Sequence, residues 1–294
     1  MRADPIAASI ATTTRGAAMS ATATHNDYVL GRTAEEYERL RWQARVWEAA
    51  TGRLFDRVEL SPGARCLDAG CGPGEVMRLM AQRVGPAGYV CGVDVDAELG
   101  AQAVAMLQLA GHRQCAFVPA DLESGEPIPG APYHLVYARL LLFHVGDPAA
   151  VLRHLWKAVA PGGVLVVHDY DLRTADVLPG LATVEEFKRV VLGAFSGAGR
   201  DVHTGHRLPA LFADAGIGAP DGTDVAGRLD PLSAAGGMFA AVYRSLLPAA
   251  VSFGLTTAED GARWFDDFAR DVRERGDDPA LWPLLIGAWK RRPA

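Results

Sequence analysis

The chain has few cysteines, and none of them forms a C-x-x-C pair. The four cysteines among its 294 residues are Cys66, Cys71, Cys91 and Cys115. Paired cysteines are typical of metal and redox sites, and no other group of residues has the spacing of metal ligands, so the sequence predicts no metal site. Three of the cysteines lie in or beside apolar segments, which indicates buried, reduced thiols in a cytoplasmic protein.

Positive charge is also scarce. The chain carries 29 Lys and Arg residues against 35 Asp and Glu residues, a net charge of −6. A protein that binds nucleic acid is expected to show a basic footprint, and we expect the densest basic run, residues 290–292, to be solvated. We therefore predict a small-molecule substrate and no nucleic-acid partner.

Long apolar runs are missing as well. No stretch approaches the roughly 18 apolar residues that cross a bilayer, so we predict no membrane partner. Residues 1–26 are rich in Ala and Thr and lack the apolar centre of a secretory signal. We expect them to be a disordered extension, and Met19 as an alternative start leaves open whether residues 1–18 are native. This segment could reach across a homo-oligomer, but the sequence gives no direct sign of one.

Glycine is concentrated in one informative stretch, residues 66–76, with the sequence CLDAGCGPGEV. It is typical of a short buried strand that ends at Asp68, a tight loop with Gly70, Gly72 and Gly74, and the start of a helix. Glycines at alternate positions allow positive φ angles and let a ligand approach the main chain closely. Amide groups at the following helix N-terminus face the same crevice. The stretch therefore predicts a nucleotide cradle.

The spacing of this loop argues against a dinucleotide. A dinucleotide fingerprint is G-x-G-x-x-G, whereas this loop is G-x-G-x-G with Asp68 two positions before Gly70. An acidic side chain there favours a ligand with a cationic group and hydroxyls over a pyrophosphate. The pattern D-x-G-x-G-x-G resembles the first motif of class I S-adenosylmethionine-dependent methyltransferases. An NAD(P)-dependent oxidoreductase remains a less favoured alternative.

Acidic residues also follow the next two predicted strands. Asp94 ends the apolar strand that begins at residue 89, and we assign it to the ribose hydroxyls. Asp96 suits the N-cap of the following helix better. Asp121 and Leu122 come just past the third strand, where the resemblance implies that the Asp binds the adenine amino group and the next backbone N–H meets the ring. The same resemblance adds Ala69, Val95 and Ala120 to the cofactor-binding residues.

A second motif of the same family lies at residues 160–163, APGG. It stops a helix that begins at Asp147 and Pro148, and it precedes the fifth strand, residues 164–170. The resemblance covers roughly residues 28–220 and the last dozen residues, and it is closest to the ubiquinone-biosynthesis-like branch with its bacterial natural-product methyltransferases. It implies an α/β fold with a Rossmann-like, doubly wound, mostly parallel sheet, an N-terminal helical cap and a helical lid insertion.

This organisation divides the chain into consecutive segments. They are the extension 1–26, the cap 27–60, the cofactor-binding core 61–231, the lid 232–278 and a last core strand within 279–294. A further strand is predicted near residues 223–230. In the cap, the resemblance makes Tyr28 and Gln43 candidates for the methionine end of the cofactor. The aromatic residues of the cap are better explained by packing on the core, and for Tyr28 both interpretations stay open.

Candidates for catalysis lie at the ends of strands four and five, where open α/β sheets bind their ligands. They are Arg139, His144, His168, Asp169 and Tyr170, of which we assign His144, Arg139 and Asp169 to catalysis, and Arg139 is also a cofactor-binding candidate. Methyl transfer from a sulfonium mainly requires alignment and exclusion of water, and a base only where the nucleophile carries a proton. His144 would be that base, although a structural histidine, hydrogen-bonded at the start of a loop, is the favoured interpretation.

The sequence thus predicts S-adenosylmethionine-dependent methyl transfer to O, N or C of a small, lipophilic secondary metabolite. Aromatic and Met residues between positions 232 and 275 suit a bulky apolar substrate, but an ordinary core has the same composition. Because fold does not fix function, a cyclase that binds S-adenosylmethionine and a non-catalytic partner subunit are alternatives. The acceptor atom, the substrate and the oligomeric state are not set by the sequence.

Overall fold

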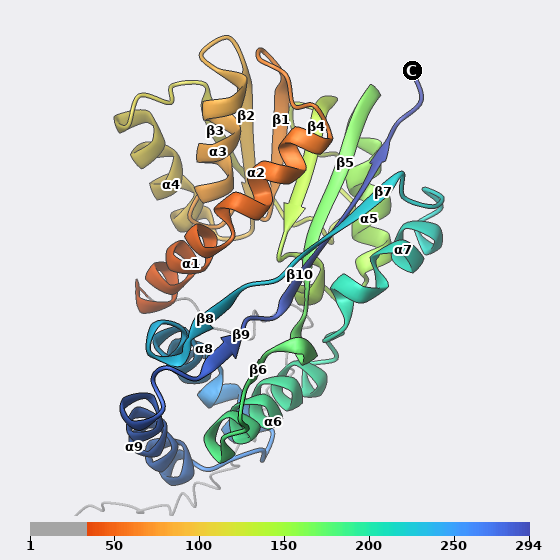
Figure 1. Ribbon diagram of the computed structural model, residues 1–294. Coiled ribbons are helices and arrows are strands. Elements are labelled where there is room, and N and C mark those ends of the chain that lie inside the picture. Colours follow the sequence, from red (N-terminus) through yellow and green to blue (C-terminus); the bar gives the residue numbers. More distant parts are fainter. Residues whose placement is uncertain (1–33) are drawn as a thin grey trace, which may run out of the picture.

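The computed structural model describes residues 34–294, and within them seven strands form one twisted sheet (Figure 1). Its order is β3-β2-β1-β4-β5-β10-β7. The strands are β1 (Arg65–Ala69), β2 (Tyr89–Asp94), β3 (Cys115–Pro119), β4 (Tyr133–Arg139), β5 (Val159–Asp171), β7 (Gly222–Ala226) and β10 (Leu284–Arg291). The first five strands are parallel, and β10 is antiparallel to both β5 and β7. The predicted mostly parallel, Rossmann-like fold is confirmed.

Helices cover both faces of this sheet. On one face lie α2 (Glu48–Arg57), α3 (Glu75–Val84) and α4 (Ala97–Leu109), and on the other lie α5 (Pro148–Lys157) and α7 (Thr204–Asp214). The sequence sets these faces by alternation, because successive strand residues point to opposite sides. In β1, Cys66 packs with the α3 side and Leu67 with the α5 side. The strand order reverses between β1 and β4, which opens a crevice at their carboxyl ends.

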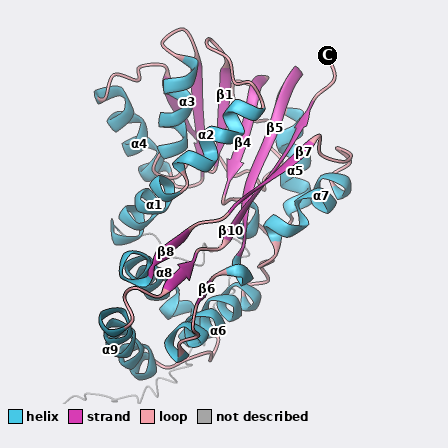
Figure 2. Ribbon diagram, in the orientation of Figure 1, coloured by secondary structure: helices cyan, strands magenta, loops and turns pink. Residues whose placement is uncertain are grey.

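A second body of structure lies beyond those carboxyl ends (Figure 2). It contains the small sheet β6-β9-β8, with β6 (Asp176–Val177), β8 (Leu229–Pro231) and β9 (Pro279–Leu281). We call the helices α6 (Ala182–Gly197), α8 (Leu232–Ser252) and α9 (Ala258–Glu274) the lid helices. Stacked rings hold them together. Trp264 of α9 lies 3.9 Å from Tyr243 of α8 between ring centroids, and Phe187 of α6 lies 5.0 Å from Phe239 of α8.

Two predicted strands are each split in the structure. The segment near 223–230 forms β7 and β8, and the last strand, predicted within 279–294, forms β9 and β10. The breaks lie opposite each other, where the Trp282 amide donates to the Arg228 carbonyl at 3.0 Å. Pro283 has no N–H to offer to a ladder, and the next amide, of Leu284, donates to the Thr174 hydroxyl instead. The two strand pairs therefore form a ribbon, β7–β8 against β9–β10, that joins the large sheet to the lid helices.

The fifth strand begins earlier than predicted, at Val159 rather than after the APGG motif. The pairing of β4 with β5 shifts register between Tyr133 and Leu135, so the motif forms an irregular part of the strand. The neighbouring chain holds it there. The Gly162 amide donates to the Arg292 carbonyl at 3.0 Å, and the Arg292 amide donates to the Gly163 carbonyl at 2.8 Å.

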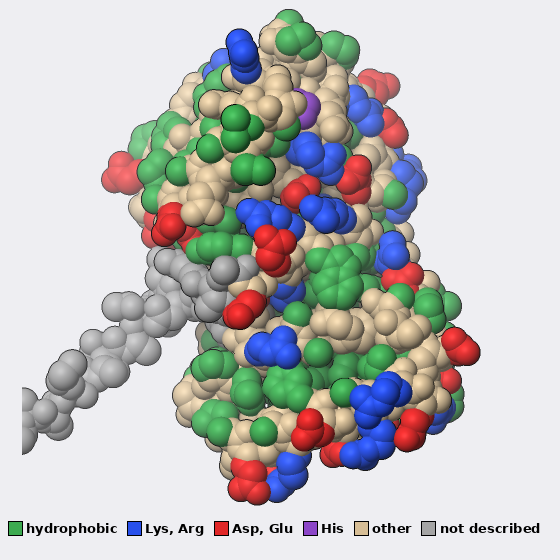
Figure 3. All heavy atoms as spheres, turned by 90° about the vertical axis from the view of Figure 1, so that its left-hand side faces the viewer, with side chains coloured by type: hydrophobic (Ala, Val, Ile, Leu, Met, Phe, Trp, Pro, Cys, Tyr) green, Lys and Arg blue, Asp and Glu red, His purple; other side chains and the backbone are tan. Residues whose placement is uncertain are grey.

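The helix α8 is long and apolar enough to span a bilayer by length and composition, with a mean hydropathy of 1.2. The sequence has no run of roughly 18 apolar residues, so the prediction from sequence did not identify this helix. Its buried residues, among them Met238, Phe239 and Leu246, pack within the lid helices, and 39% of its apolar segment is buried. Basic and acidic side chains are interspersed over the face drawn in Figure 3.

The four cysteines are buried and unpaired, as the sequence predicts. Burial raises the pKa of Cys66 to about 12, so this thiol stays protonated and unreactive. The predicted extension 1–26, Tyr28 and the residues before Ala34 lie outside the described part of the chain.

Candidate active site

A cavity of about 310 Å³ lies at the carboxyl ends of the parallel strands, between the sheet, α1 (Ala34–Val46) and the lid helices. This volume is within the range of small-molecule sites. Eleven residues predicted for cofactor or catalysis line it together, namely Gln43, Asp68, Gly70, Gly72, Asp94, Val95, Ala120, Asp121, Leu122, Arg139 and His144. Ala69, Gly74 and Asp169 do not line the cavity, and Tyr28 lies outside the described residues.

The glycine loop adopts the backbone conformation that its sequence predicts. Gly70, Gly72 and Gly74 have φ angles of 71°, 47° and 79°, in the left-handed region that favours glycine. A Cβ atom at Gly72 would meet nothing within 4 Å, whereas one at Gly74 would lie 2.9 Å from the Cβ of Ala103 on α4. Gly72 thus leaves room for a ligand, and Gly74 allows α3 and α4 to pack closely.

Asp68 presents a carboxylate oxygen without a partner to this loop. The residue is 2% exposed, and its Oδ2 atom has no hydrogen-bond partner among the described residues. Burial raises its pKa to about 7, although the Arg139 charge lowers it, and Asp94 raises it further. An unpaired buried carboxylate oxygen is costly. Asp68 therefore fits a ligand that brings a cationic donor, such as the ammonium of an amino-acid moiety.

Asp94 joins the glycine loop to the end of β2. Its Oδ2 accepts the Gly72 amide and its Oδ1 accepts the Asp96 amide, both at 2.9 Å. Carboxylate oxygens have further lone pairs, so Asp94 retains acceptor capacity toward ligand hydroxyls. Asp96 accepts the Leu99 amide at 3.0 Å, which confirms it as the N-cap of α4. Asp121 stands past β3 and accepts the Glu123 amide at 2.8 Å.

The cap helix α1 closes this side of the cavity. Tyr37 donates to Asp96 at 2.7 Å, which ties α1 to α4. Arg39 and Glu36 form a buried ion pair at 2.7 Å, and Glu36 also accepts the Ser245 hydroxyl of α8 at 2.6 Å. The cap therefore bridges the cofactor-binding loops and the lid helices.

His144 lines the cavity beside aromatic rings, 3.9 Å from Phe143 and 5.9 Å from Phe195 between centroids. Burial, together with the charges of Arg39 and Arg200, lowers its pKa to about 3. The imidazole is therefore neutral at physiological pH, but it is a weak base. Arg139 donates to the Thr51 hydroxyl at 3.0 Å, which anchors this lining guanidinium to α2.

The structure corrects the prediction for Asp169. The strand β5 continues to Asp171, so Asp169 is not at its end, and its side chain is fully buried away from the cavity. It accepts the Leu142 amide at 2.8 Å and the Tyr170 amide at 3.0 Å, and burial raises its pKa to about 7. Asp169 therefore holds the short helix at Leu142–His144 against β5 and does not meet a ligand.

The other side of the cavity is apolar. The sequence left open whether residues 232–275 face a substrate or a core, and it did not single out the residues of 143–195 that also line this side. This side is formed by Phe143, Leu172, Ala175, Phe187, Val191, Phe195, Met238, Phe239, Val242, Trp282 and Pro283. Most of these residues belong to helical stripes, and a stripe has the same pattern whether it faces a core or a cavity. Their convergence depends on how the lid helices pack.

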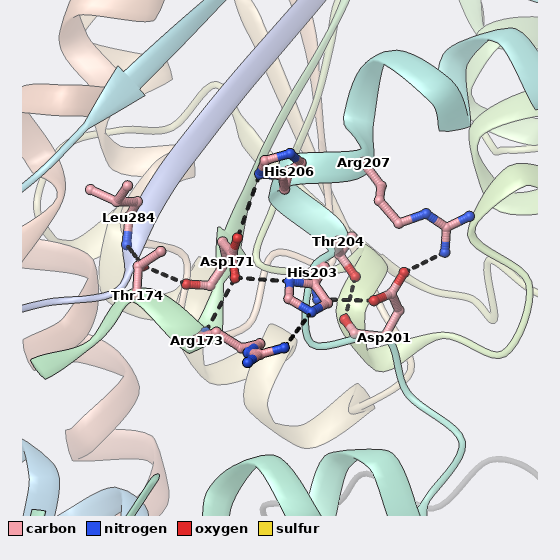
Figure 4. Close-up of polar contacts among 9 residues, drawn as sticks. All are labelled: Asp171, Arg173, Thr174, Asp201, His203, Thr204, His206, Arg207 and Leu284. Atoms are coloured by element: carbon pink, nitrogen blue, oxygen red, sulfur yellow. Dashed lines mark hydrogen bonds and ion pairs between the residues drawn. The ribbon is translucent and has the colours of Figure 1, made fainter.

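Polar contacts fix the base of the lid near this wall (Figure 4). Asp171, at the end of β5, pairs at 3.3 Å with His203, which directly precedes α7. It also lies 3.7 Å from His206, in the first turn of α7. Thr174 donates to the Asp171 carbonyl at 2.7 Å and accepts the Leu284 amide at 2.7 Å. The junction therefore links β5, α7 and β10 where the chain leaves the large sheet.

Comparisons with curated proteins give partial matches. A trans-aconitate 2-methyltransferase from Paracidovorax citrulli is 40% identical over 122 residues, which is 41% of this chain and 44% of that protein. An uncharacterized 37.1 kDa protein in transposon TN4556 of Streptomyces fradiae is 29% identical over 223 residues, 74% of this chain and 61% of that one. The chain thus spans about half the length of the curated relatives it matches.

Solved structures with low sequence identity show the same fold. One from Bacillus halodurans C-125 has a TM-score of 0.57 at 16% identity and covers 84% of this chain and 100% of its own. The YcgJ protein from Bacillus subtilis has a TM-score of 0.53 at 17% identity and covers 84% and 99%.

A family model described as a methyltransferase domain matches residues 39–217, more than half of the chain. The family predicted from the sequence is confirmed, while the narrower ubiquinone-biosynthesis-like branch stays a prediction. The matched residues run from α1 to just past α7 and include the strand ends that carry Asp68, Asp94 and Asp121. The chain therefore belongs to the methyltransferase-domain family.

Proposed function

We propose that this protein transfers a methyl group from S-adenosylmethionine to O, N or C of a small lipophilic metabolite. The observation that carries the proposal is a cavity with two chemically different sides. Carboxylates at the ends of β1, β2 and β3 form one side, and aromatic and aliphatic residues of β5 and the lid helices form the other. A cationic, hydroxyl-rich cofactor suits the first side, and an apolar substrate suits the second.

The acidic side offers a distinct group to each part of the cofactor. The unpartnered oxygen of Asp68 would bind the ammonium of the methionine moiety, with Gln43 and Tyr28 as further candidates there. Asp94 would accept the ribose hydroxyls, and Asp121 with Leu122 would bind the adenine. Val95 and Ala120 would complete the cofactor contacts around these strand ends. When bound, the cofactor supplies a methyl group on a sulfonium, which is a good leaving group.

The protein's own contribution is alignment and exclusion of water. The cap helix and the lid helices cover the strand ends from two directions. His144 lines the cavity, but with a pKa of about 3 it takes up a proton poorly. The acceptor is therefore a group that is already nucleophilic at neutral pH, or one whose proton leaves after the transfer. Arg139 would orient the ligands at the boundary between the two sides.

Label transfer tests this proposal. Purified protein is first titrated with S-adenosylmethionine by calorimetry and is then incubated with the methyl-labelled cofactor and a panel of apolar phenols, amines and enols. We expect stoichiometric binding and label in an extractable product. If the protein does not bind S-adenosylmethionine, the proposal is wrong. Product without label would support the cyclase alternative, and binding without any product would support a non-catalytic partner subunit.

The proposed function also includes the partners of the protein and its location in the cell. The methyltransferase relatives and the negative net charge support a small-molecule substrate, and a cytoplasmic location fits the buried thiols. A homo-oligomer stays a prediction.

A further inference from the structure

The hydroxyl of Tyr170 lies at the boundary between the two sides of the cavity and receives two hydrogen bonds. The residue belongs to β5, is 3% exposed and lines the cavity. The indole Nε1–H of Trp47 donates to its oxygen at 2.5 Å, and the Nε2–H of Gln43 donates to it at 3.1 Å. Both donors come from the cap side of the chain, at Gln43 in α1 and at Trp47 just after it.

The direction of both bonds is fixed by chemistry. An indole N–H can only donate. The orientation of the Gln43 amide is set by Arg39, whose Nη1 donates to the Gln43 Oε1 at 3.2 Å and cannot accept. The Gln43 nitrogen therefore faces Tyr170, and the two bonds occupy both lone pairs of the phenol oxygen.

The proton of Tyr170 then needs an acceptor of its own. Among residues 34–294, none accepts a hydrogen bond from this hydroxyl. A buried donor without a partner is costly, so a ligand that supplies an acceptor gains affinity here. Burial raises the pKa of Tyr170 to about 12, so the hydroxyl keeps its proton at physiological pH and acts as a donor.

The surroundings of Tyr170 indicate which ligand meets this donor. Its ring packs against Trp47 and Phe143, at 6.0 and 6.3 Å between centroids, and the apolar lining of the lid begins beside it. The cofactor's cationic and hydroxyl groups are matched by carboxylates at the ends of β1 and β2, on the other side of the cavity. Two acceptors can then meet this donor, the methionine carboxylate of the cofactor and an oxygen of the substrate. We favour the substrate because the apolar lining, which suits it, begins at Tyr170.

We propose that Tyr170 is a substrate-binding residue whose hydroxyl donates to an oxygen of an otherwise apolar substrate. This inference rests on the proposed function and narrows its substrate class to apolar molecules that carry a carbonyl, carboxylate or ether oxygen beside the methyl acceptor. Gln43 and Trp47 orient the Tyr170 hydroxyl, and the hydrogen bond to the substrate comes from Tyr170 alone.

Two probes of the same shape test the inference. 2-Acetylnaphthalene carries a carbonyl oxygen, and 2-isopropenylnaphthalene has a methylene in its place. The dissociation constant of each is measured by calorimetry with protein saturated with S-adenosylhomocysteine. The proteins are the wild type, Tyr170→Phe, and Tyr243→Phe as a matched control, since Tyr243 is also buried but does not line the cavity.

We expect the preference for the ketone to fall roughly fivefold to tenfold in Tyr170→Phe, the worth of one hydrogen bond, and to stay unchanged in Tyr243→Phe. An unchanged preference in Tyr170→Phe, or no binding of either probe to the wild type, overturns the inference. S-Adenosylhomocysteine binding is measured in the same samples. Its absence in the wild type is a failure of the proposed function, whereas its presence with an unchanged preference is a failure of the Tyr170 assignment alone.

Discussion

Asp68 stands in an environment that is costly without a ligand. It is buried, one of its oxygens has no partner among the described residues, and its pKa is raised to about 7. Above that pH the carboxylate is ionised and pairs with an ammonium group. Below it, the carboxyl is neutral and the pair is lost. Binding of the cofactor product should therefore be coupled to the titration of this one group.

We predict that S-adenosylhomocysteine binds more weakly at pH 6 than at pH 7.5, with a change of up to about tenfold per pH unit below the raised pKa. Calorimetry at four pH values between 5.5 and 7.5 measures this slope. Asp68→Asn keeps the shape of the side chain but cannot ionise, so its affinity should be lower by roughly tenfold or more at pH 7.5 and flat with pH. A slope that persists in Asp68→Asn would assign the titration to another group.

The sequence predicted single residues well where local position decides their role. Asp68, Asp94 and Asp121 each stand at a strand end, and the sheet brings these ends together. Asp169 was wrongly placed because its side chain accepts the Leu142 amide and does not face the cavity. The donor role of Tyr170 depends on Gln43 and Trp47, more than a hundred positions away, and no local pattern records such a contact.

At the scale of elements, α7 approaches β5 unusually closely at Gly205. A Cβ atom there would lie 2.4 Å from the Asp169 carbonyl oxygen and 2.8 Å from the Tyr170 carbonyl carbon. Both are backbone atoms of β5 and cannot turn aside as a side chain would. This contact therefore sets the distance between the helix and the strand that carries Tyr170.

We predict that Gly205→Ala lowers the free energy of unfolding by about 1–3 kcal/mol, the usual cost of overpacking. The matched control is Gly52→Ala in α2, where a Cβ atom would meet nothing within 4 Å. It should be stabilising by about 0.5–1 kcal/mol, because alanine is the better helix former. Urea unfolding measures both, and a Gly205→Ala variant as stable as the wild type would contradict the close approach.

Helix starts were predictable, while the ribbon was not. Asp96 and Asp147 accept the Leu99 and Ala150 amides, as N-caps placed by local sequence. The breaks between β7 and β8 and between β9 and β10 depend on the pairing of segments some 50 residues apart. Pro283 was a local signal for one of them, but the partner break beside Arg228 is visible only once the strands are paired.

For the whole molecule, the cavity is shared between two bodies with different tasks. The carboxylates belong to the large sheet, and the apolar lining comes mostly from the lid helices and the ribbon. A change confined to the lid should therefore affect substrate binding without affecting cofactor binding.

We predict that Val242→Trp, on the cavity side of α8, weakens binding of 2-acetylnaphthalene by about tenfold or more, because the larger side chain fills the apolar space. Its affinity for S-adenosylhomocysteine should stay within about twofold of the wild type. Val251→Trp, on the same helix but 38% exposed and outside the cavity lining, should leave both affinities unchanged. Both affinities are measured by calorimetry. Loss of S-adenosylhomocysteine binding in Val242→Trp would contradict the assignment of cofactor binding to the large sheet and substrate binding to the lid.

The family and the core of the fold follow from motifs that lie close together in the sequence, at residues 66–76, 89–96 and 160–163. The lid does not, because it is assembled from two separate stretches. The first holds β6 and α6, and the second runs from β8 through α9 to β9. Their joint cavity wall requires long-range packing that hydrophobic periodicity alone does not specify.

The ribbon has a consequence for how such a protein diversifies. The chain leaves for α8 at Pro231 and returns at Pro279, and these two residues face each other across β8 and β9. The segment between them is thus inserted at one place in the fold, where its two ends are held side by side by the pairing of β8 with β9. Helices can therefore be exchanged there without breaking the strands that carry Asp68 and Asp94. Under the proposed function, such an exchange would change the substrate while the cofactor site stays the same.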